Sequence, residues 1–596
     1  MFIAKTAGQS LHPDGWTEKR LNTSRLNHLL RNRYLVAAFA GLMMAASFPK
    51  IGIAGLAWVA PGVMLAAALG KRGFETFRLG YVAGLVHYLV SLYWLLWIPY
   101  RWHGIPVGPA AGWLALGMFL ALFPATWVWV MTEVQSPGVD QCKSEDQSGS
   151  RRRKEADSGV AVQSRNWVGR TIWTLSGAAA WVGMEMFIAR VFSGFPWDLL
   201  GVSQHKMIPL IQIASVTGIY GVSFILVWTS LSLFAAAMTI LRQPTARSAW
   251  VPDIILPATA VLLLFVVGFH RLKEPATIPE GLVPAGRPDA LRVTFVQPSI
   301  PQTLIWDASR SDERFGELLH LSEQALTNKA DLMIWPEAAV PKLFRWHRDM
   351  FEPITGLARS NQVWVIIGAD DMEPKPGSDK VADADFFNSS FLIGPDGALR
   401  GTYKKRGLVI FGEYVPLARW LPFMKYFTPV EGGFTPGRKP VPFRLSDLHV
   451  NASVLICFED IFPHLAREYV QDDTDFLVNI TNNGWFGESA AQWQHGMSAI
   501  FRAIENGVPL LRCSNNGLTC WVDQFGRVRQ VFRDAKGTIY GPGVMTAEIP
   551  LARGSRTRTF YNAHGDVFGW VCVGWSLLLI ARKVILLRSR KIPKVE

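Results

Sequence analysis

The sequence is poor in charge. Asp, Glu, Lys and Arg make up 18% of its 596 residues, whereas hydrophobic residues make up 49% and include 24 Trp and 35 Phe. So apolar a composition excludes an intrinsically disordered chain, and the length excludes one small domain. It indicates a membrane protein with a sizeable soluble part. The sequence contains no repeat of fixed period, no Ser-His-Asp pattern and no metal-ligand spacing, and its 12 His are scattered.

Long uncharged runs are nearly absent from the second half of the chain and frequent in the first. A single run could be a buried helix of a soluble protein, but seven clustered in the first half favour a membrane domain. We therefore expect eight transmembrane helices, each near the ~17–25 residues that cross a bilayer. The runs are Tyr34–Phe48, Ile51–Leu69, Leu79–Ile98, Val107–Met131, Ile172–Phe192, Tyr220–Ile240, Ile254–Phe269 and Val567–Ala581.

Every second loop between these runs is basic, as the positive-inside rule requires. Lys and Arg precede the first run, follow the last, and lie after the second, fourth and sixth runs. We therefore expect both termini in the cytoplasm and the segment between runs seven and eight outside. Because residues 1–33 are polar, we expect no cleaved signal peptide.

The net charge of +13 is unevenly divided. Asp289–Pro550 holds 26 Lys and Arg against 31 Asp and Glu, and the remainder holds 34 against 16. The positive excess belongs to membrane-side segments, which removes the support for a nucleic-acid partner. We predict a cytoplasmic tail at 1–33, a membrane domain at 34–270 with a disordered insertion at 135–166, an outer domain at 289–552, an eighth helix at 566–588 and a tail at 589–596.

The outer segment alternates short β-rich runs with helical stretches, which predicts an α/β fold with covered sheets. Helices are expected at Ser309–Lys329 and Gln492–Asn506. Several of the expected strands end in polar residues, and chemistry in α/β sheets usually occurs at the carboxyl ends of strands. These residues are Glu337, Asp370, Cys457 with Glu459, and Asn482 with Asn483.

Cys457 is a candidate nucleophile because it follows the apolar run SVLI, where a strand gives way to a turn. Taken alone, a buried core cysteine is the more common explanation. Glu337 and Lys405 favour chemistry. A carboxylate can take the thiol proton, and a lysine with a backbone N–H after the cysteine can stabilise an oxyanion.

Three segments resemble the catalytic segments of the nitrilase superfamily: IWPEAAVP at 334, YKKRGLVIFGEYVP at 403 and LICFEDIFP at 455. With seven membrane runs before this domain and one after it, the chain resembles the bacterial apolipoprotein N-acyltransferases. FVQPSIPQTLIWD at 295, TNNGWFG at 481, QWQHGMSAIFRAIENGVPLLRCSNNG at 492, FSGFPWDLLGVSQ at 192 and TGIYGVSF at 217 add to the resemblance. It implies an αββα sandwich with a Glu-Lys-Cys triad.

The resemblance implies a role for each matching residue. Glu337 would be the general base and Cys457 the nucleophile. The family's lysine lies eight residues before the Glu of FGE, which is Glu413 here, so Lys405 is favoured over the adjacent Lys404. Glu413 would orient the lysine and the cysteine.

Five further residues match positions near the site and its acyl substrates: Trp306, Phe458, Glu459, Asn482 and Trp485. For the two tryptophans, packing at a membrane-facing interface is the other explanation. Gly407, Ile410, Phe458 and Asn483 depart from the family's usual His, Pro, Tyr and Asp. These departures leave the triad intact.

The family transfers an acyl chain in two steps without a cofactor. A phospholipid would acylate Cys457, and the α-amino group of the S-diacylglyceryl cysteine of an apolipoprotein would then accept the chain. The resemblance implies a monomer in the bacterial inner membrane with the catalytic domain on the periplasmic side. A membrane-tethered nitrilase-type amidohydrolase is the alternative. A transporter would show inverted repeats, which are not apparent.

Two other features remain open. Glu185 lies inside the fifth apolar run, where an ionisable residue is costly and often functional, although structural pairing is the favoured explanation. Cys513 and Cys520 flank SNNGLT. A two-residue turn at Asn516-Gly517 would place them opposite one another on a hairpin, where a disulfide could form in the periplasm.

Overall fold

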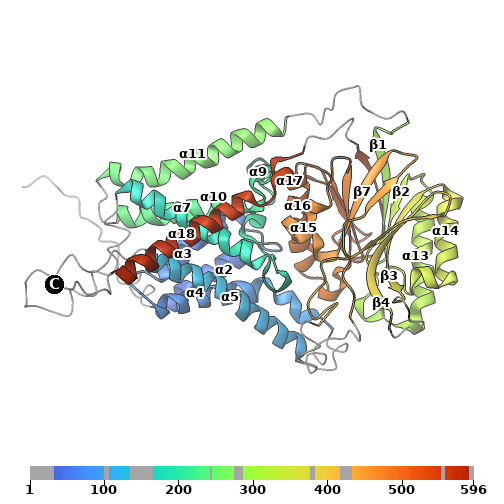
Figure 1. The fold of residues 1–596 in the computed structure, drawn as a ribbon, viewed down its shortest axis with the longest axis horizontal. Coiled ribbons are helices and arrows are strands. Elements are labelled where there is room, and N and C mark those ends of the chain that lie inside the picture. Colours follow the sequence, from blue (N-terminus) through green and yellow to red (C-terminus); the bar gives the residue numbers. More distant parts are fainter. Residues whose placement is uncertain are drawn as a thin grey trace, which may run out of the picture.

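The computed structural model describes residues 32–99, 107–134, 166–241, 245–273, 286–305, 307–375, 377, 383–415, 433–551 and 558–589. A bundle of helices lies on one side of the molecule and two stacked sheets lie on the other (Figure 1). Most of the predicted insertion at 135–166, the predicted tails except Asn32, Arg33 and Ser589, and Trp306 lie outside the described residues.

Each of the eight apolar runs lies on helical structure. Apolar residues surround most of these helices, as expected for helices buried in protein or lipid. The helices are α2 (Arg33–Ala46), η1 (Ala54–Trp58) with α3 (Ala60–Ala67), α4 (Phe74–Ser91) with η2 (Tyr93–Trp97), α5 (Gly108–Val134), α7 (Trp167–Ile188), α10 (Ile219–Ile240), α11 (Arg247–Arg271) and α18 (Val567–Ser589). Short turns connect them: η6 (Val191–Ser193), η7 (Leu200–Gln204), α8 (Ile208–Ile211), α9 (Ala214–Thr217) and α17 (Phe560–His564).

Within the described residues, three helices are long and apolar enough to cross a membrane: Gly108–Glu133, Ile219–Ile240 and Arg247–Arg271. The second and third runs instead divide into a 3-10 helix and an α-helix. The last of the three long helices is hardly buried inside the protein, and it exposes Leu262, Leu263, Val266, Val267 and Phe269. A bare apolar face of this size suits contact with lipid.

The α/β sandwich is confirmed. Its first sheet has the strand order β12-β1-β2-β3-β4-β5, and helices α13 (Ser311–Leu326) and α14 (Arg348–Asn361) cover its outer face (Figure 1). The central strands β1, β2 and β3 are parallel, and the flanking pairs are antiparallel. The strands are β1 (Ala290–Gln297), β2 (Leu332–Ile334), β3 (Trp364–Glu373), β4 (Asp385–Ile393), β5 (Leu399–Lys404) and β12 (Gly543–Pro550).

The second sheet has the order β11-β10-β9-β8-β7-β6 and packs its apolar face on the first. Helices α15 (Pro463–Glu468) and α16 (Ala491–Asn506) cover its other face and lie between it and the bundle (Figure 1). Its strands are β6 (Pro442–Leu445), β7 (Val450–Ile456), β8 (Phe476–Thr481), β9 (Leu510–Ser514), β10 (Cys520–Val522) and β11 (Val528–Val531).

Gln494 of α16 fastens this sheet to the helical bundle. Its amide oxygen accepts hydrogen bonds from the indoles of Trp94 and Trp197 at 2.8 and 3.0 Å. Its amide nitrogen donates to the carbonyl oxygens of Pro49 and Ser91 at 2.9 and 3.1 Å. One buried side chain thus joins three separate segments of the bundle to the sandwich.

The disulfide considered between Cys513 and Cys520 is absent, and both thiols are free. Cys520 lies opposite Arg512 rather than opposite Cys513. A shift of one residue moves a side chain to the other face of a sheet. The Cys513 thiol therefore faces the first sheet, where it donates to the Val296 and Ile334 carbonyl oxygens, and Cys520 lies on the face of Arg512.

Glu185 is paired within the helical domain. Its carboxylate accepts hydrogen bonds from the Trp181 indole at 3.0 Å and from the Leu200 backbone N–H at 2.8 Å. These bonds fasten the loop after α7 to that helix, which supports the structural explanation.

Candidate functional site

Cys457 lies on a sharp turn at the end of β7. Its φ of +54° falls in the left-handed region, which non-glycine residues seldom adopt. A 3-10 helix, Cys457–Ile461, begins at the cysteine itself. The first N–H groups of a helix have no intrahelical acceptor, and that of Phe458 is among them. The turn therefore offers a thiol beside a backbone donor.

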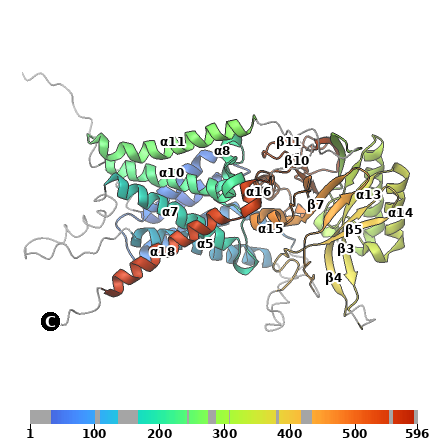
Figure 2. The same ribbon diagram turned by 45° about the horizontal axis from the view of Figure 1, so that its top comes forward.

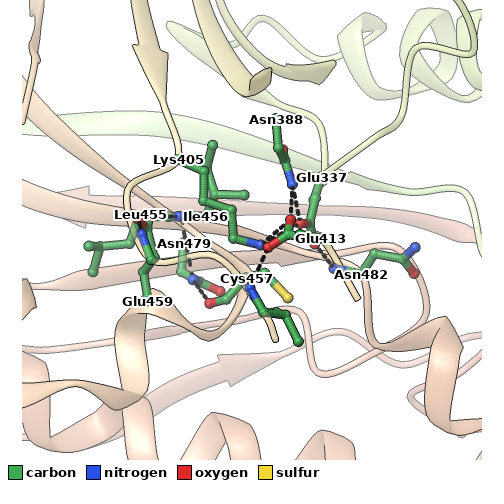
Figure 3. A network of polar contacts seen from close by, with 12 residues as sticks. Glu337, Asn388, Lys405, Glu413, Leu455, Ile456, Cys457, Glu459, Asn479 and Asn482 are labelled. Carbon is green, nitrogen blue, oxygen red and sulfur yellow. Dashed lines mark hydrogen bonds and ion pairs between the residues drawn. The ribbon is translucent and has the colours of Figure 1, made fainter. Parts of the chain in front are cut away.

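Glu337 follows β2 and is 7% exposed. Its Oε1 accepts hydrogen bonds from Lys405 Nζ at 3.2 Å and from Asn388 Nδ2 at 2.8 Å. Its Oε2 accepts from the Asn482 backbone N–H at 2.9 Å. Figure 3 shows these groups converging beside Cys457.

Lys405 follows β5 and is 1% exposed. Its Nζ donates to Glu413 Oε1 at 2.8 Å as well as to Glu337. Burial opposes its charge, but the carboxylates of Glu337 and Glu413 outweigh that effect and raise the pKa of Lys405 well above its usual range. The adjacent Lys404 instead pairs with Glu373 at 2.5 Å. Of the two lysines, Lys405 is therefore the one within the cluster.

The surroundings of Cys457 disfavour its thiolate. Burial and then the nearby Glu337 carboxylate raise its pKa to about 12, and Lys405 opposes this rise. A thiol of this kind needs a base at the moment of attack.

Glu413 and Asn388 complete the hydrogen-bond network around Lys405. Glu413 Oε1 accepts from both Lys405 and Asn388, and its Oε2 accepts from the Val409 backbone N–H at 2.9 Å. The predicted position of Glu413 beside the lysine agrees with this geometry. Asn388 was missed, because it is one of several polar residues in β4 and carries no motif of its own.

Glu459 joins the cysteine turn to the lysine loop. It is fully buried, and its oxygens accept from the backbone N–H groups of Ile456, Arg406 and Gly407 at 2.7 to 2.9 Å and from the Tyr403 hydroxyl. A Cβ added at Gly407 would lie 3.3 Å from Glu459 Cγ. A larger residue at this position would therefore be in tight contact with Glu459.

Three other predicted substrate residues lie in the described part of the second sheet's loops. Phe458 is half-buried, and Lys405 Nζ lies 5.7 Å from the centre of its ring. Trp485 is half-buried on the 3-10 helix Asn483–Phe486. Asn482 is buried, and its Nδ2 donates to Gln302.

A second polar cluster supports the turn from the α16 side. Asp460 accepts from His495 Nε2 at 2.7 Å and pairs with Arg512. Asn483, which departs from the family's Asp, keeps its Oδ1 3.0 Å from His495 Nδ1. Sequence reasoning did not identify this cluster, because its members are far apart in the chain.

Two family models match the chain. "Apolipoprotein N-acyltransferase N-terminal domain" covers residues 40–232, and "Carbon-nitrogen hydrolase" covers residues 292–559. Together they span the helical bundle and the sandwich.

Curated relatives match over nearly the full length. The chain is 34% identical over 569 residues to the apolipoprotein N-acyltransferase of Geobacter metallireducens, covering 94% of this chain and 97% of that protein. It is 27% identical over 520 residues to that of Haemophilus influenzae, covering 86% and 89%. Among solved structures, an amidase from Nesterenkonia sp. is 17% identical with a TM-score of 0.33, covering 46% of this chain and 94% of that one.

Proposed function

The chain belongs to the apolipoprotein N-acyltransferase family, and on that premise we propose that Cys457 carries the acyl chain as a thioester between two transfer steps. Glu337 is the base, Lys405 stabilises the oxyanions, and Glu413 holds the lysine. The observation that carries this proposal is the buried network beside the Cys457 turn, in which Lys405 reaches Glu337 and Glu413 at 3.2 and 2.8 Å.

In the first step Glu337 takes the thiol proton, and the Cys457 sulfur attacks an ester carbonyl of a phospholipid. Lys405 and the Phe458 N–H stabilise the oxyanion that develops. When the C–O bond breaks, Glu337 returns the proton to the leaving oxygen of the lysophospholipid. The support for a base is that burial and the nearby Glu337 carboxylate raise the pKa of Cys457.

In the second step the α-amino group of a diacylated apolipoprotein attacks the thioester. Glu337 takes a proton from the attacking nitrogen and delivers it to the Cys457 sulfur as the C–S bond breaks. The products are an amide and a free thiol. Two lipid substrates brought together in the plane of a membrane need no search through water, which suits a catalytic domain fastened to a helical bundle.

Phe458, Asn482 and Trp485, together with Trp306, line the route of the acyl chain in this proposal. Glu459 has a different role from the one that the resemblance implied. Its oxygens already accept several hydrogen bonds from protein groups, which supports a role in positioning the cysteine turn against the lysine loop.

The membrane arrangement follows the same reasoning. We propose eight spans, both termini in the cytoplasm of a bacterial inner membrane, and the sandwich on the periplasmic side as a monomer. The support is the helical structure at all eight runs and the basic loops between alternate pairs of runs. Site-specific labelling of single cysteines introduced at Arg72 and Ser309 tests it: only the second should react with an impermeant thiol reagent in intact spheroplasts.

The alternative is an amidohydrolase that gives the acyl chain to water. Radiolabelled phospholipid supplied with a diacylated lipopeptide separates the two functions. We expect the label on the peptide with the wild type and no transfer with Cys457→Ala. Label recovered mainly as free fatty acid would favour the hydrolase, and transfer by Cys457→Ala would refute the thioester.

A further inference from the structure

Asp370 is a charged residue near the site that neither transfer step uses. It lies on β3 directly opposite Asn388 of β4. Residues opposite one another in an antiparallel pair share one face of the sheet, with Cβ atoms about 5 Å apart. Because Asn388 donates to both Glu337 and Glu413, Asp370 lies on the face that carries this cluster.

The two faces of β3 differ in their contacts. Gly368, on the same face as Asp370, lies so close to Glu337 that an added Cβ would meet the Glu337 Cα at 2.7 Å. The next residue, Asp371, lies on the opposite face and pairs with Arg345 at 2.7 Å. Of the two adjacent aspartates, Asp370 is therefore the one that faces the site.

The Asp370 carboxyl group takes no part in this hydrogen-bond network. It has no hydrogen-bond or ion-pair partner in the part of the chain that the structure describes, and it is half-buried. Its charge interacts with those of Glu337, Glu413 and Lys405. Three carboxyl groups thus interact with the one ammonium group of Lys405: Glu337 and Glu413 as ion pairs, and Asp370 through its charge. This excess of negative charge favours a cationic group on the ligand.

The acceptor of the second step has such a group. An α-amino group has a pKa of about 8, so it is largely an ammonium ion at neutral pH. It must lose one proton before its lone pair can attack and another after the C–N bond forms. Glu337 holds one proton at a time, so a second acceptor at the site would separate the two transfers.

We propose that Asp370 binds the α-ammonium group of the apolipoprotein and takes its first proton. This inference rests on the proposed thioester mechanism. The ammonium gives one proton to the Asp370 carboxylate, and the resulting neutral amine attacks the thioester carbonyl. Glu337 moves the second proton from nitrogen to the Cys457 sulfur as the C–S bond breaks. The Asp370 carboxyl group then releases its proton to water.

The proton affinity of Asp370 suits this task. Burial, followed by the carboxylates of Glu337 and Glu413, raises the pKa of Asp370 to about 7, with a smaller rise from Asp371 and an opposing effect of Lys405. This value is near that of an α-amino group, about 8, as effective proton transfer requires. Above about pH 7 Asp370 is ionised and can receive the proton. Below about pH 7 the Asp370 carboxyl group already carries a proton, so the reaction with the apolipoprotein should slow.

The test uses the full-length enzyme with Asp370→Asn, and Glu373→Gln as the matched control. Glu373 lies on the same strand but is exposed and pairs with Lys404. Each protein is loaded with phospholipid alone and then given either a diacylated lipopeptide or methoxyamine, a nucleophile that is already neutral near pH 7. Formation and loss of the Cys457 thioester are followed by mass spectrometry.

We expect Asp370→Asn to form the thioester without slowing. Its reaction with the lipopeptide at about pH 7 should fall on the order of tenfold to a hundredfold. The deficit should narrow at alkaline pH, and methoxyamine should react normally. Glu373→Gln should match the wild type throughout.

Two results would overturn the inference alone: an unchanged pH profile for the lipopeptide reaction, or equal slowing with lipopeptide and methoxyamine. A wild type that forms no thioester at all would overturn the proposed function, and the inference with it.

Discussion

The two sheets of the catalytic domain contribute to the site in different ways. The first sheet supplies Glu337 after β2, Asn388 on β4 and Lys405 after β5, whereas the second supplies Cys457 after β7. Helix α16 of the second sheet is bonded to the helical bundle through Gln494. The first sheet lies farther from the bundle, beneath α13 and α14 (Figure 2).

This difference separates two tasks. In the proposed mechanism, the nucleophile belongs to the sheet whose covering helix α16 is bonded to the bundle, and proton transfer and charge stabilisation belong to the other sheet. Substitutions in the first sheet should therefore slow acyl transfer with little effect on the contact between the sandwich and the helical bundle. Substitutions at α16 should weaken that contact with little effect on acyl transfer.

The largest effect is expected in the first sheet. Glu337→Gln removes the proposed base, and acyl transfer should fall on the order of 10²–10⁴-fold. The helical bundle should keep its thermal stability, since no bond of Glu337 reaches it. A steady-state transfer assay with membrane-extracted protein measures this, and a loss of less than tenfold would show that another group serves as the base.

A smaller effect is expected where the two sheets meet. Glu459→Gln turns one buried acceptor into a donor that faces backbone N–H groups. Each unsatisfied group costs about 1–3 kcal/mol. We expect a lower unfolding midpoint and slower thioester formation, measured by denaturant titration and intact mass. Glu468→Gln is the control, because Glu468 is exposed where it pairs with Arg406; equal effects of the two changes would contradict the account.

At α16 a substitution is expected to weaken the contact between the sandwich and the helical bundle rather than to slow acyl transfer. Gln494→Leu removes bonds to Trp94, Trp197, Pro49 and Ser91 and should destabilise the junction by about 1–3 kcal/mol. Limited proteolysis between the two domains should then become faster. Gln324→Leu on α13, an exposed position, should change stability by no more than about 0.5 kcal/mol. An unchanged rate of proteolysis in Gln494→Leu would contradict the claim that α16 fastens the second sheet to the bundle.

The smallest effect concerns the cysteines. Because Cys513 and Cys520 lie on opposite faces of the second sheet, a reducing agent should leave the melting temperature of the catalytic domain unchanged. Differential scanning fluorimetry with and without dithiothreitol measures this. A drop on reduction, together with a Cys513–Cys520 cross-link in peptide mapping, would contradict the register of β9 and β10.

Much of this architecture could be predicted from local patterns. The uncharged runs form helices, because their side chains are apolar and a helix satisfies its own backbone hydrogen bonds. Apolar segments such as SVLI form central strands. Strands β5, β6, β11 and β12 were not predicted, since they lie toward the edges of the sheets and lack a continuous apolar run. The number of spans stays a prediction, because length and composition distinguish three helices within the described residues.

The site was partly predictable for the same reason. Glu337, Lys405, Glu413 and Cys457 lie in local motifs, and the structure brings them together. Asn388 and the Asp460–Arg512–His495 cluster depend on contacts between distant segments. The sequence left the Cys513–Cys520 pairing open. In the structure Cys520 lies opposite Arg512, one residue away from Cys513, because the loop between β9 and β10 is longer than a two-residue turn.

The central claim is that Cys457 carries the acyl chain. Peptide mapping of the wild-type enzyme, incubated with a defined phospholipid and no acceptor, tests it most directly. We predict one acyl group on the Cys457 peptide, removed by hydroxylamine and transferred on addition of a diacylated lipopeptide. An unmodified Cys457 in an enzyme that still transfers acyl chains would contradict the account.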